Sequence, residues 1–218
     1  MSGPPPPRPP LILASASPRR RELLPALRVP FSVRAADVDE TPPAGALPER
    51  AAAAIAERKA SAALAFAPPG ALVLAADTVV ACDGRALGKP RDAAEARLML
   101  TALAGREHAV FTAVVLACGA RQLGETAGAR VLMRGYSADE IEASIAAGTP
   151  FDKAGAYAIQ DPLLHPAERC DGCYCNVMGL PLWTVRRLLQ TLAPALRPAP
   201  PDATLLRCAA CPLRDGAD

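Results

Sequence analysis

The sequence predicts an α/β fold built on a mixed sheet, and three observations indicate it. The chain has 218 residues, of which 51% are hydrophobic, so it can build a substantial core. Strand-like and helix-like segments alternate along most of the chain. Two neighbouring strand-like segments are joined by a hairpin around GARQLGE, a connection that is typical of antiparallel pairing rather than of a purely parallel sheet.

The first expected elements are short. Residues 11–14 are mostly apolar and predict a buried strand. Ser17 is suited to cap a helix and Pro18 to occupy its first position, so we expect a helix from there to about Leu27, limited by a proline in its last turn. Residues 30–40 alternate like a strand and end in acidic side chains.

The middle of the chain predicts three longer elements. Residues 49–67 are strong helix formers, and residues 71–81 have the β-branched and apolar side chains of a buried strand. A turn and a loop are expected over 82–90, because this segment is rich in glycine and ends in proline. An amphipathic helix is expected over 91–103.

The second half begins with the hairpin, whose strands are expected over 108–118 and 126–134. Residues 137–148 predict a helix with a capping box at its start and a glycine at its end. Residues 149–162 show no period, and residues 181–196 predict the last helix.

Composition and charge exclude several classes of function. The net charge is +2 without a clustered basic face, so we expect no nucleic-acid partner. No apolar run is long enough to span a membrane or to act as a signal peptide, and we therefore expect a cytoplasmic protein. The expected organisation is a disordered proline-rich tail over 1–10, one domain over 11–197, and a tail with prolines and cysteines over 198–218 that lies off the core.

The use of lysine marks three positions. Of 24 basic residues, 21 are arginine and only Lys59, Lys89 and Lys153 are lysine. Either these positions require a compact, flexible ammonium group, or they are remnants of codon bias.

A candidate anion site lies in SASPRR, residues 15–20. Two hydroxyls, the free N–H groups of a helix start and two guanidinium groups suit phosphate oxygens. The alternative is an ordinary helix cap followed by solvated arginines.

Three further segments could carry chemistry. Asp77 stands at the end of a buried strand, where it could bind a metal, activate a water or cap a turn. GRALGKP, residues 84–90, resembles a P-loop but is one residue short and has proline at the Ser/Thr position, although Lys89 could still reach a phosphate. FDKAGAYAIQ, residues 151–160, either lets a ligand approach its small residues or forms a plain surface loop.

Six blocks then occur in the order SASPRR, ERKA, ADTVV, GKP, FDKAGAYAIQ and NVMGLPL. Together they resemble the signature blocks of the Maf family of nucleoside triphosphate pyrophosphatases, over about residues 11–195. All three lysines fall inside these blocks, which favours the functional explanation for them.

The resemblance implies an α/β fold related to the inosine triphosphate pyrophosphatases, with two lobes flanking a deep cleft and often a homodimer. Family members cleave a nucleoside triphosphate to the monophosphate and pyrophosphate with a divalent metal, so Mg²⁺ or Mn²⁺ is expected. The loop that reads AGAYAIQ is similar to that of the branch preferring dTTP and UTP, with modified pyrimidine nucleotides as further candidates.

The resemblance also implies residue roles. Asp77 matches the proton acceptor, and Glu40 matches an acid that helps Asp77 with the metal. The positions that match phosphate-binding residues are Ser15, Arg19, Arg20, Lys59 and Lys89, and those tied to base choice are Arg19, Thr78 and Gln160. The Gln160 amide offers one donor group and one acceptor, which suit the edge of uracil or thymine.

Two other interpretations come from the family name and from the cysteines. The name is linked to septum formation, so the alternative function is a regulatory interaction protein with little turnover. The two C-x-x-C pairs, Cys170 with Cys173 and Cys208 with Cys211, could form a zinc site, although their separation exceeds the usual spacing. Cys173 and Cys175 could equally be plain substitutions, and we expect the tail cysteines to be dispensable for catalysis.

The remaining cysteines and the histidines carry no expected chemistry. Cys82 and Cys118 lie at strand ends and are expected to be buried thiols. His108 and His165 lie outside the six blocks and are expected to be structural or surface residues.

Overall fold

The computed structural model describes residues 9–203 and 205–214, so most of the segment expected to be a disordered tail lies outside the described residues. The described chain contains a seven-stranded sheet in the order β2-β1-β3-β5-β6-β7, with β4 paired to β3 off this path. β1 runs parallel to β2 and β3, and the other pairs are antiparallel. This confirms the mixed sheet. The strands are β1 (Leu11–Leu13), β2 (Phe31–Val33), β3 (Leu72–Cys82), β4 (Arg85–Leu87), β5 (Glu107–Cys118), β6 (Arg121–Met133) and β7 (Ala167–Gly172).

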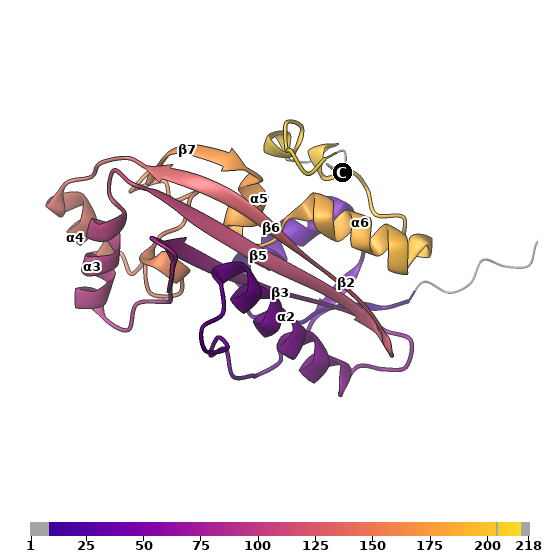
Figure 1. The fold of residues 1–218 in the computed structure, drawn as a ribbon. Coiled ribbons are helices and arrows are strands. Elements are labelled where there is room, and N and C mark those ends of the chain that lie inside the picture. Colours follow the sequence, from indigo (N-terminus) through magenta and orange to yellow (C-terminus); the bar gives the residue numbers. More distant parts are fainter. Residues whose placement is uncertain (1–8, 204, 215–218) are drawn as a thin grey trace, which may run out of the picture.

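Helices pack on both faces of this sheet (Figure 1). The α-helices are α1 (Pro18–Leu23), α2 (Pro48–Leu64), α3 (Ala93–Leu103), α4 (Ala138–Ala146), α5 (Tyr174–Met178) and α6 (Leu182–Leu192). Short 3₁₀ helices are η1 (Leu24–Leu27), η2 (Ala154–Ala156), η3 (Pro194–Leu196), η4 (Pro201–Ala203) and η5 (Leu206–Cys208). The helix expected to run to about Leu27 ends at Leu23, and the residues around Pro25 form the 3₁₀ helix η1 instead, so the proline does limit the α-helix.

Helix α2 covers one face of the central strands. Side chains alternate across a strand, so Val73 and Ala75 of β3 share this face and pack against α2. The buried side of α2 is mostly alanine, which allows the helix to lie close to the sheet. Lys59 projects from the same buried side, and only 7% of it is exposed.

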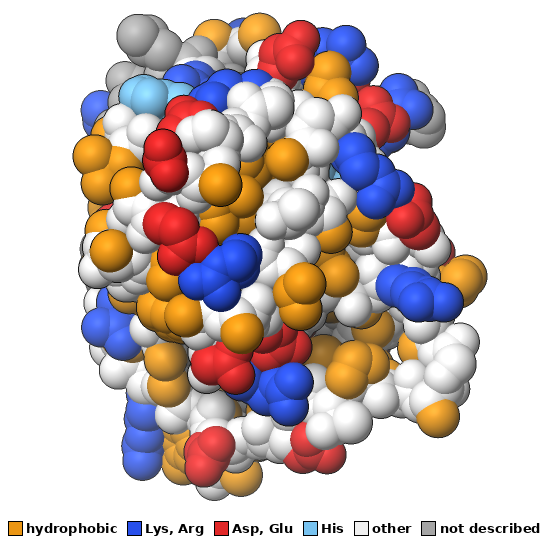
Figure 2. Space-filling view, turned by 90° about the vertical axis from the view of Figure 1, so that its left-hand side faces the viewer, with side chains coloured by type: hydrophobic (Ala, Val, Ile, Leu, Met, Phe, Trp, Pro, Cys, Tyr) orange, Lys and Arg blue, Asp and Glu red, His pale blue; other side chains and the backbone are white. Residues whose placement is uncertain are grey.

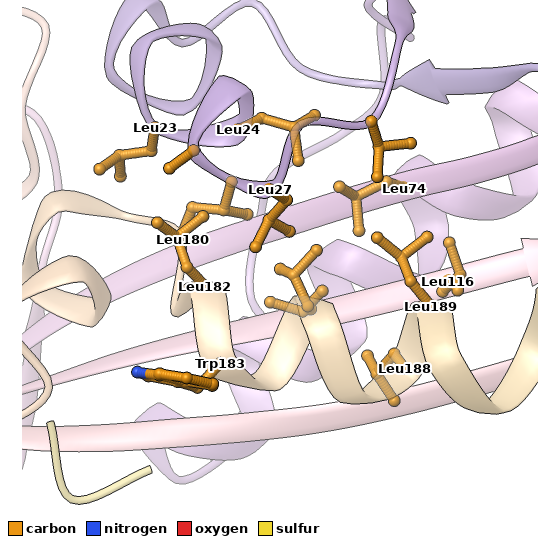
Figure 3. Packing of buried hydrophobic residues seen from close by; sticks show 14 of the residues in the cluster. Leu23, Leu24, Leu27, Leu74, Leu116, Leu180, Leu182, Trp183, Leu188 and Leu189 are labelled. Carbon is orange, nitrogen blue, oxygen red and sulfur yellow. The ribbon is translucent and has the colours of Figure 1, made fainter. Parts of the chain in front are cut away.

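The opposite face is covered by α1, η1 and α6. Figure 3 shows the leucines of α1 and η1 above those of α6, with Leu74 and Leu116 of the sheet beside them toward the right; all belong to one cluster. Helix α6 places leucines at helical spacing on its buried side, which is why the sequence predicts it well.

A third hydrophobic cluster lies at the far end of the long strands. Leu100 of α3 and Ile141 of α4 pack there with Val110, Val131 and Met133 of the sheet. Strands β3, β5 and β6 therefore run through two lobes, one with α2 and α6 and the other with α3 and α4 (Figure 1). The face at the α3–α4 end carries basic and acidic side chains intermixed with hydrophobic ones (Figure 2).

Part of the segment expected to be a loop forms a strand. Asp83 and Gly84 both have positive φ, 51° and 73°, which is typical of the type I′ turn of a two-residue hairpin. The hairpin adds β4 to the edge of β3, with Val80 opposite Leu87. The Asp-Gly pair is a recognised hairpin signal, and the short strand after it was too brief to show a period.

The C-terminal segment contradicts the expectation that it lies off the core. Leu205 and Leu213 pack against the cluster beneath α6, and Cys208 and Cys211 belong to that cluster. The indole N–H of Trp183 donates to the backbone oxygen of Cys208 at 3.0 Å. In Figure 1 this segment, in yellow, lies over α5 and α6. Its apolar residues are too few for a periodic signal, so only the docked structure shows their burial.

Other expectations concern single residues and spans. None of the described helices is both long enough and apolar enough to cross a membrane. His108 is buried, its Nε2 lies 2.7 Å from the Tyr157 hydroxyl, and burial lowers the pKa of His108 to about 4. His165 is exposed. Cys82 is buried and Cys118 is half-buried, so the expectation holds fully only for Cys82.

Candidate active site

A cleft of about 720 Å³ lies where one edge of β3 has no strand partner. β1 pairs with β3 only over Leu72–Leu74, and β4 pairs with it only over Val80–Cys82. Residues 77–80 of β3 line the cleft, whose walls come from residues 14–20 of one lobe and from residues between 152 and 160 of the other.

Asp77 lies at the centre of β3 and lines this cleft. The sequence placed it at the end of its strand, and that detail is wrong because β3 continues along β5 as far as Ala81. What ends beside Asp77 is the neighbouring strand, β1. The cleft therefore does open at the end of a strand, as expected, but that strand is β1 and not β3, which carries Asp77.

Lys59 of α2 joins two carboxylates in the cleft. Its Nζ lies 2.7 Å from Oδ1 of Asp77 and 2.7 Å from Oε1 of Glu40. Asp77 and Lys59 are both buried, whereas the Glu40 side chain is 52% exposed at the rim. One ammonium group thus holds both acids on the same side of the cleft.

Burial and charge act differently on the two acids. Burial raises the pKa of the Asp77 carboxyl, and the nearby charges of Lys59 and Arg20 offset this only in part. Burial also acts to raise the pKa of Glu40, but the hydrogen bond and charge of Lys59 outweigh it, so the pKa of Glu40 is lowered. The environment therefore makes Asp77 a stronger base than an ordinary aspartate and Glu40 a weaker base than an ordinary glutamate.

Arg20 of α1 is the centre of a second group of polar contacts, which lies on the face of β3 opposite to Asp77. Its Nε donates to the backbone oxygen of Gly179 at 2.8 Å, its Nη1 to Oγ of Ser15 at 3.0 Å and its Nη2 to Oγ1 of Thr78 at 3.0 Å. All three acceptors are neutral. Burial lowers the pKa of Arg20, yet a guanidinium stays protonated at neutral pH, so a buried positive charge faces the cleft.

Thr78 and Asp77 point to opposite faces because they are consecutive in a strand. Thr78 Oγ1 lies 2.9 Å from Oγ1 of Thr112, whose backbone N–H donates to Oδ1 of Asn176 at 3.0 Å. The Asn176 amide N–H in turn donates to the backbone oxygen of Val110 at 2.9 Å. Thr78, Thr112 and Asn176 therefore form a connected hydrogen-bond network that holds the Arg20 guanidinium in position.

Arg19 reaches across the cleft. Its Nη1 lies 3.3 Å from Oδ2 of Asp152, which belongs to the opposite wall. Asp152 also pairs with Lys153, whose Nζ donates to the backbone oxygen of Thr149 at 2.5 Å. The pair between Arg19 and Asp152 is half-exposed and links the two lobes at the mouth of the cleft.

Lys89 and Gln160 complete the opposite wall. Both are exposed and both line the cleft. Lys89 carries its charge close enough to Glu40 to contribute to the lowered pKa of that acid. The structure thus brings all nine sequence-predicted site residues to one cleft, namely Ser15, Arg19, Arg20, Glu40, Lys59, Asp77, Thr78, Lys89 and Gln160.

Three supporting residues were missed by sequence reasoning. They are Thr112, Asn176 and Gly179, which hold Thr78 and Arg20 in place. Asn176 and Gly179 lie inside the block NVMGLPL, so the block signalled their position but not their role. Thr112 is one polar residue in an apolar strand, a pattern that gave no functional signal.

The arrangement combines a buried base with several cations. Such a site can bind a polyphosphate chain through Arg20, Arg19 and Lys89 and place a water near the Asp77 carboxylate. Three carboxylates line the cleft, those of Glu40, Asp77 and Asp152, and the first two lie on the same lysine, so they are the pair that could share a divalent cation.

Known proteins resemble this chain along most of its length. The family model of Maf-like proteins matches residues 10–192. A dTTP/UTP pyrophosphatase of Thermomicrobium roseum is 53% identical over 209 residues, covering 93% of each chain. One of Myxococcus xanthus is 49% identical and covers 83% of this chain and 91% of its own. Among solved structures, a nucleoside-triphosphatase / dITP/XTP pyrophosphatase of Mycobacterium abscessus matches 57% of this chain and 74% of its own, at 20% identity and a TM-score of 0.37.

Proposed function

The chain belongs to the Maf family, and from this membership we propose that it hydrolyses dTTP and UTP to the nucleoside monophosphate and pyrophosphate. Relatives at 53% and 49% identity carry the name dTTP/UTP pyrophosphatase. The observation that supports the proposal is the cleft itself, in which a buried guanidinium lies beside a carboxylate pair bridged by lysine.

Arg20 is the main phosphate ligand in this proposal. Its hydrogen bonds hold the planar group in one orientation, and they go to neutral oxygens, so its charge is left to attract an anion. Arg19 and Lys89 lie at the mouth, where they can meet the remaining phosphates. Arg19 must exchange Asp152 for substrate to do so.

Asp77 is the proton acceptor. A water adds to phosphorus, its proton passes to the Asp77 carboxylate, and the bond from phosphorus to the oxygen bridging the α and β phosphates breaks. The products are the monophosphate and pyrophosphate. Burial makes this carboxylate more basic than an ordinary aspartate, while Lys59 favours its charged form.

Glu40 and Asp77 fit a divalent cation. Two carboxylates together with substrate phosphates are a usual ligand set for Mg²⁺, and the Lys59 ammonium shows that a positive charge is accommodated between them. We propose Mg²⁺ or Mn²⁺ as the cofactor, which would neutralise charge on the phosphate oxygens. For Lys59 to act as a phosphate ligand, its Nζ must exchange a carboxylate oxygen for a phosphate oxygen.

Gln160 is the proposed base-selecting residue. Its amide carries a donor group and an acceptor, which match the alternating edge of uracil or thymine. Thr78 is already bonded to Arg20 and Thr112, so its contribution to base choice passes through the position of Arg20. Arg19 would help to fix the nucleotide at the mouth of the cleft.

The proposal is tested by pyrophosphate release over a panel of nucleotides with Mg²⁺ or Mn²⁺. We expect kcat/KM for dTTP and UTP to exceed that for ATP and GTP by about tenfold or more, because a site built for one base edge leaves its polar groups unpaired with another. Gln160→Ala should reduce this selectivity. Gln122→Ala, an exposed glutamine outside the residues that line the cleft, is the control.

A preference for purine triphosphates, or unchanged selectivity in Gln160→Ala, would overturn the assignment of the base. Absence of turnover with every nucleotide would instead favour the regulatory alternative linked to septum formation, which no observation on the described residues supports. A cytoplasmic location and a homodimer are part of the proposal, and sedimentation of the purified chain tests the second.

A further inference from the structure

Four cysteines lie together where the C-terminal segment meets α5. Cys173 and Cys175 stand at the start of α5, and Cys208 and Cys211 come from η5 and the turn after it. All four are buried, with 1%, 3%, 1% and 8% of each residue exposed. Docking of the C-terminal segment brings the two pairs together across more than thirty intervening residues.

All four cysteines belong to one buried cluster. Sγ of Cys175 lies 3.4 Å from Sγ of Cys208, and the Cys173 thiol lies near those of Cys175 and Cys211. A disulfide would require about 2.05 Å between sulfurs. The observed separation is nearer the edge of a tetrahedron of thiolates around one zinc ion, roughly 3.8 Å for Zn–S bonds of about 2.3 Å.

The backbone beside these cysteines forms tight turns. The Asn176 N–H donates to the backbone oxygen of Cys173 at 3.0 Å, and the Cys211 N–H lies 3.4 Å from the backbone oxygen of Cys208. These turns fix the backbone next to the ligand side chains, as supporting groups around metal ligands do.

Basic side chains lie beside the cluster. Arg207 stacks on the ring of Tyr174 at 4.1 Å, and Arg214 lies over the ring of Trp183 at 5.9 Å. Arg214 also pairs with Asp202 at 3.3 Å. Zinc with four thiolates carries a net negative charge, and Arg207, next to Cys208 in the chain, is a basic residue near the cluster, whereas the charge of Arg214 is balanced by Asp202.

We propose that Cys173, Cys175, Cys208 and Cys211 bind one Zn²⁺ as a tetrahedral structural site. Four soft sulfur ligands that leave no open position are the donor set of structural zinc. Within the described residues no group of three or more His, Cys, Asp or Glu side chains is arranged to hold a metal ion, so binding requires the four thiols to be rearranged around the zinc. Binding converts thiols to thiolates and releases their protons.

Cys170 is not part of this site. It lies on β7, is half-buried and packs against the cluster of the other lobe. The ligand pattern is therefore Cys-x-Cys with Cys-x-x-Cys, rather than the two C-x-x-C pairs that the sequence suggested.

The site would fasten the C-terminal segment to α5. That helix carries Asn176, which holds Thr112, and it ends at Gly179, whose backbone oxygen accepts the bond from Arg20. Zinc bound here would therefore stabilise the support of the cleft without touching the substrate.

The test is the metal content of the full, untagged chain purified under reducing conditions and desalted. We expect about one Zn²⁺ per chain by elemental analysis. Refolding with Co²⁺ should give the thiolate charge-transfer and tetrahedral d–d bands. Cys208→Ser and Cys211→Ser should lose the metal and lower the melting temperature by roughly 5 °C or more. Cys118→Ser and Cys170→Ser are matched controls and should keep it.

Three results would overturn the proposal. One is a reduced, folded wild-type chain that takes up neither Zn²⁺ nor Co²⁺. Another is a native mass that shows two disulfides among these four cysteines. The third is zinc that survives Cys211→Ser but is lost in Asp77→Asn, because that would place the ion in the cleft. None of these measurements depends on the nucleotide that the enzyme cleaves.

Discussion

At position 77, a single carboxylate is subject to opposing influences. Burial disfavours its charge, and Lys59 at 2.7 Å favours it. Burial makes the Asp77 carboxylate a better base. The charge of Lys59 keeps a fraction of it ionised, and this ionised fraction can accept a proton. The neighbouring Glu40 shares the lysine but is half-exposed, so its pKa moves in the opposite direction.

We predict that Asp77→Asn lowers kcat by at least ~100-fold while leaving the chain folded. Asparagine keeps the shape of the side chain but cannot accept the proton. The measurement is pyrophosphate release together with the melting temperature, which should stay within roughly 5 °C of the wild type. Asp37→Asn, an exposed acid outside the residues lining the cleft, is the control. Near-normal turnover in a folded Asp77→Asn chain would remove Asp77 from the catalytic role.

The raised pKa of Asp77 also predicts the pH dependence of catalysis. The base must be ionised, so kcat/KM of the wild type should fall as the pH drops through the pKa of Asp77. Because burial raises that pKa, the midpoint of this acid limb should lie above the ordinary value of 3.8. A midpoint at or below the ordinary value, in a chain shown to remain folded at that pH, would contradict the assignment.

Among the elements, the short helix α5 links the site to the rest of the fold. It ends at Gly179, which has a φ of 109° and offers its backbone oxygen to Arg20. A Cβ at this position would lie 3.3 Å from Oγ1 of Thr78 and 3.6 Å from Nε of Arg20. Glycine is therefore favoured by the backbone conformation and by the close approach of Thr78, which holds Arg20.

We predict that Gly179→Ala lowers kcat/KM by about tenfold or more, because it displaces Arg20 and Thr78. Gly148→Ala is the matched control. Gly148 also has a positive φ, 73°, at the end of a helix, but a Cβ there would meet nothing within 4 Å. Backbone strain should lower the melting temperature of both variants. Only Gly179→Ala should also have a lower kcat/KM than the wild type. Equal kcat/KM in the two folded variants would show that the contact with Arg20 is unimportant.

At the scale of the whole molecule, the C-terminal segment completes the larger lobe. Leu205 and Leu213 pack on the cluster beneath α6, and Trp183 donates to the backbone of Cys208. Removing the segment would expose this apolar surface to water.

We predict that truncation after Arg197 lowers the melting temperature by roughly 5 °C or more, or makes the chain insoluble. The matched control ends at Arg214 and keeps every described contact of the segment. The measurement is thermal unfolding of both chains beside the wild type. A chain ending at Arg197 that melts like the wild type would show that the packing seen for Leu205 and Leu213 contributes nothing.

The sequence by itself determined the local features of this protein. Helix-forming composition located α2, and amphipathic spacing or a capping box located α3 and α4. The last helix, α6, and the apolar strands β3 and β5 were also located, because these signals depend only on residues close in the chain. Block resemblance collected the nine candidate site residues, which the structure then brings to one cleft. Their catalytic and binding roles stay predictions.

Only the tertiary structure decided what depends on contacts between distant segments. It showed that β1 ends beside Asp77, that Lys59 bridges Asp77 to Glu40, and that Asn176 supports the network beneath Arg20. It also docked the C-terminal cysteines against α5, where the sequence expected a separate tail. Such contacts join residues tens of positions apart, and their formation is decided by the packing of whole elements rather than by any local pattern.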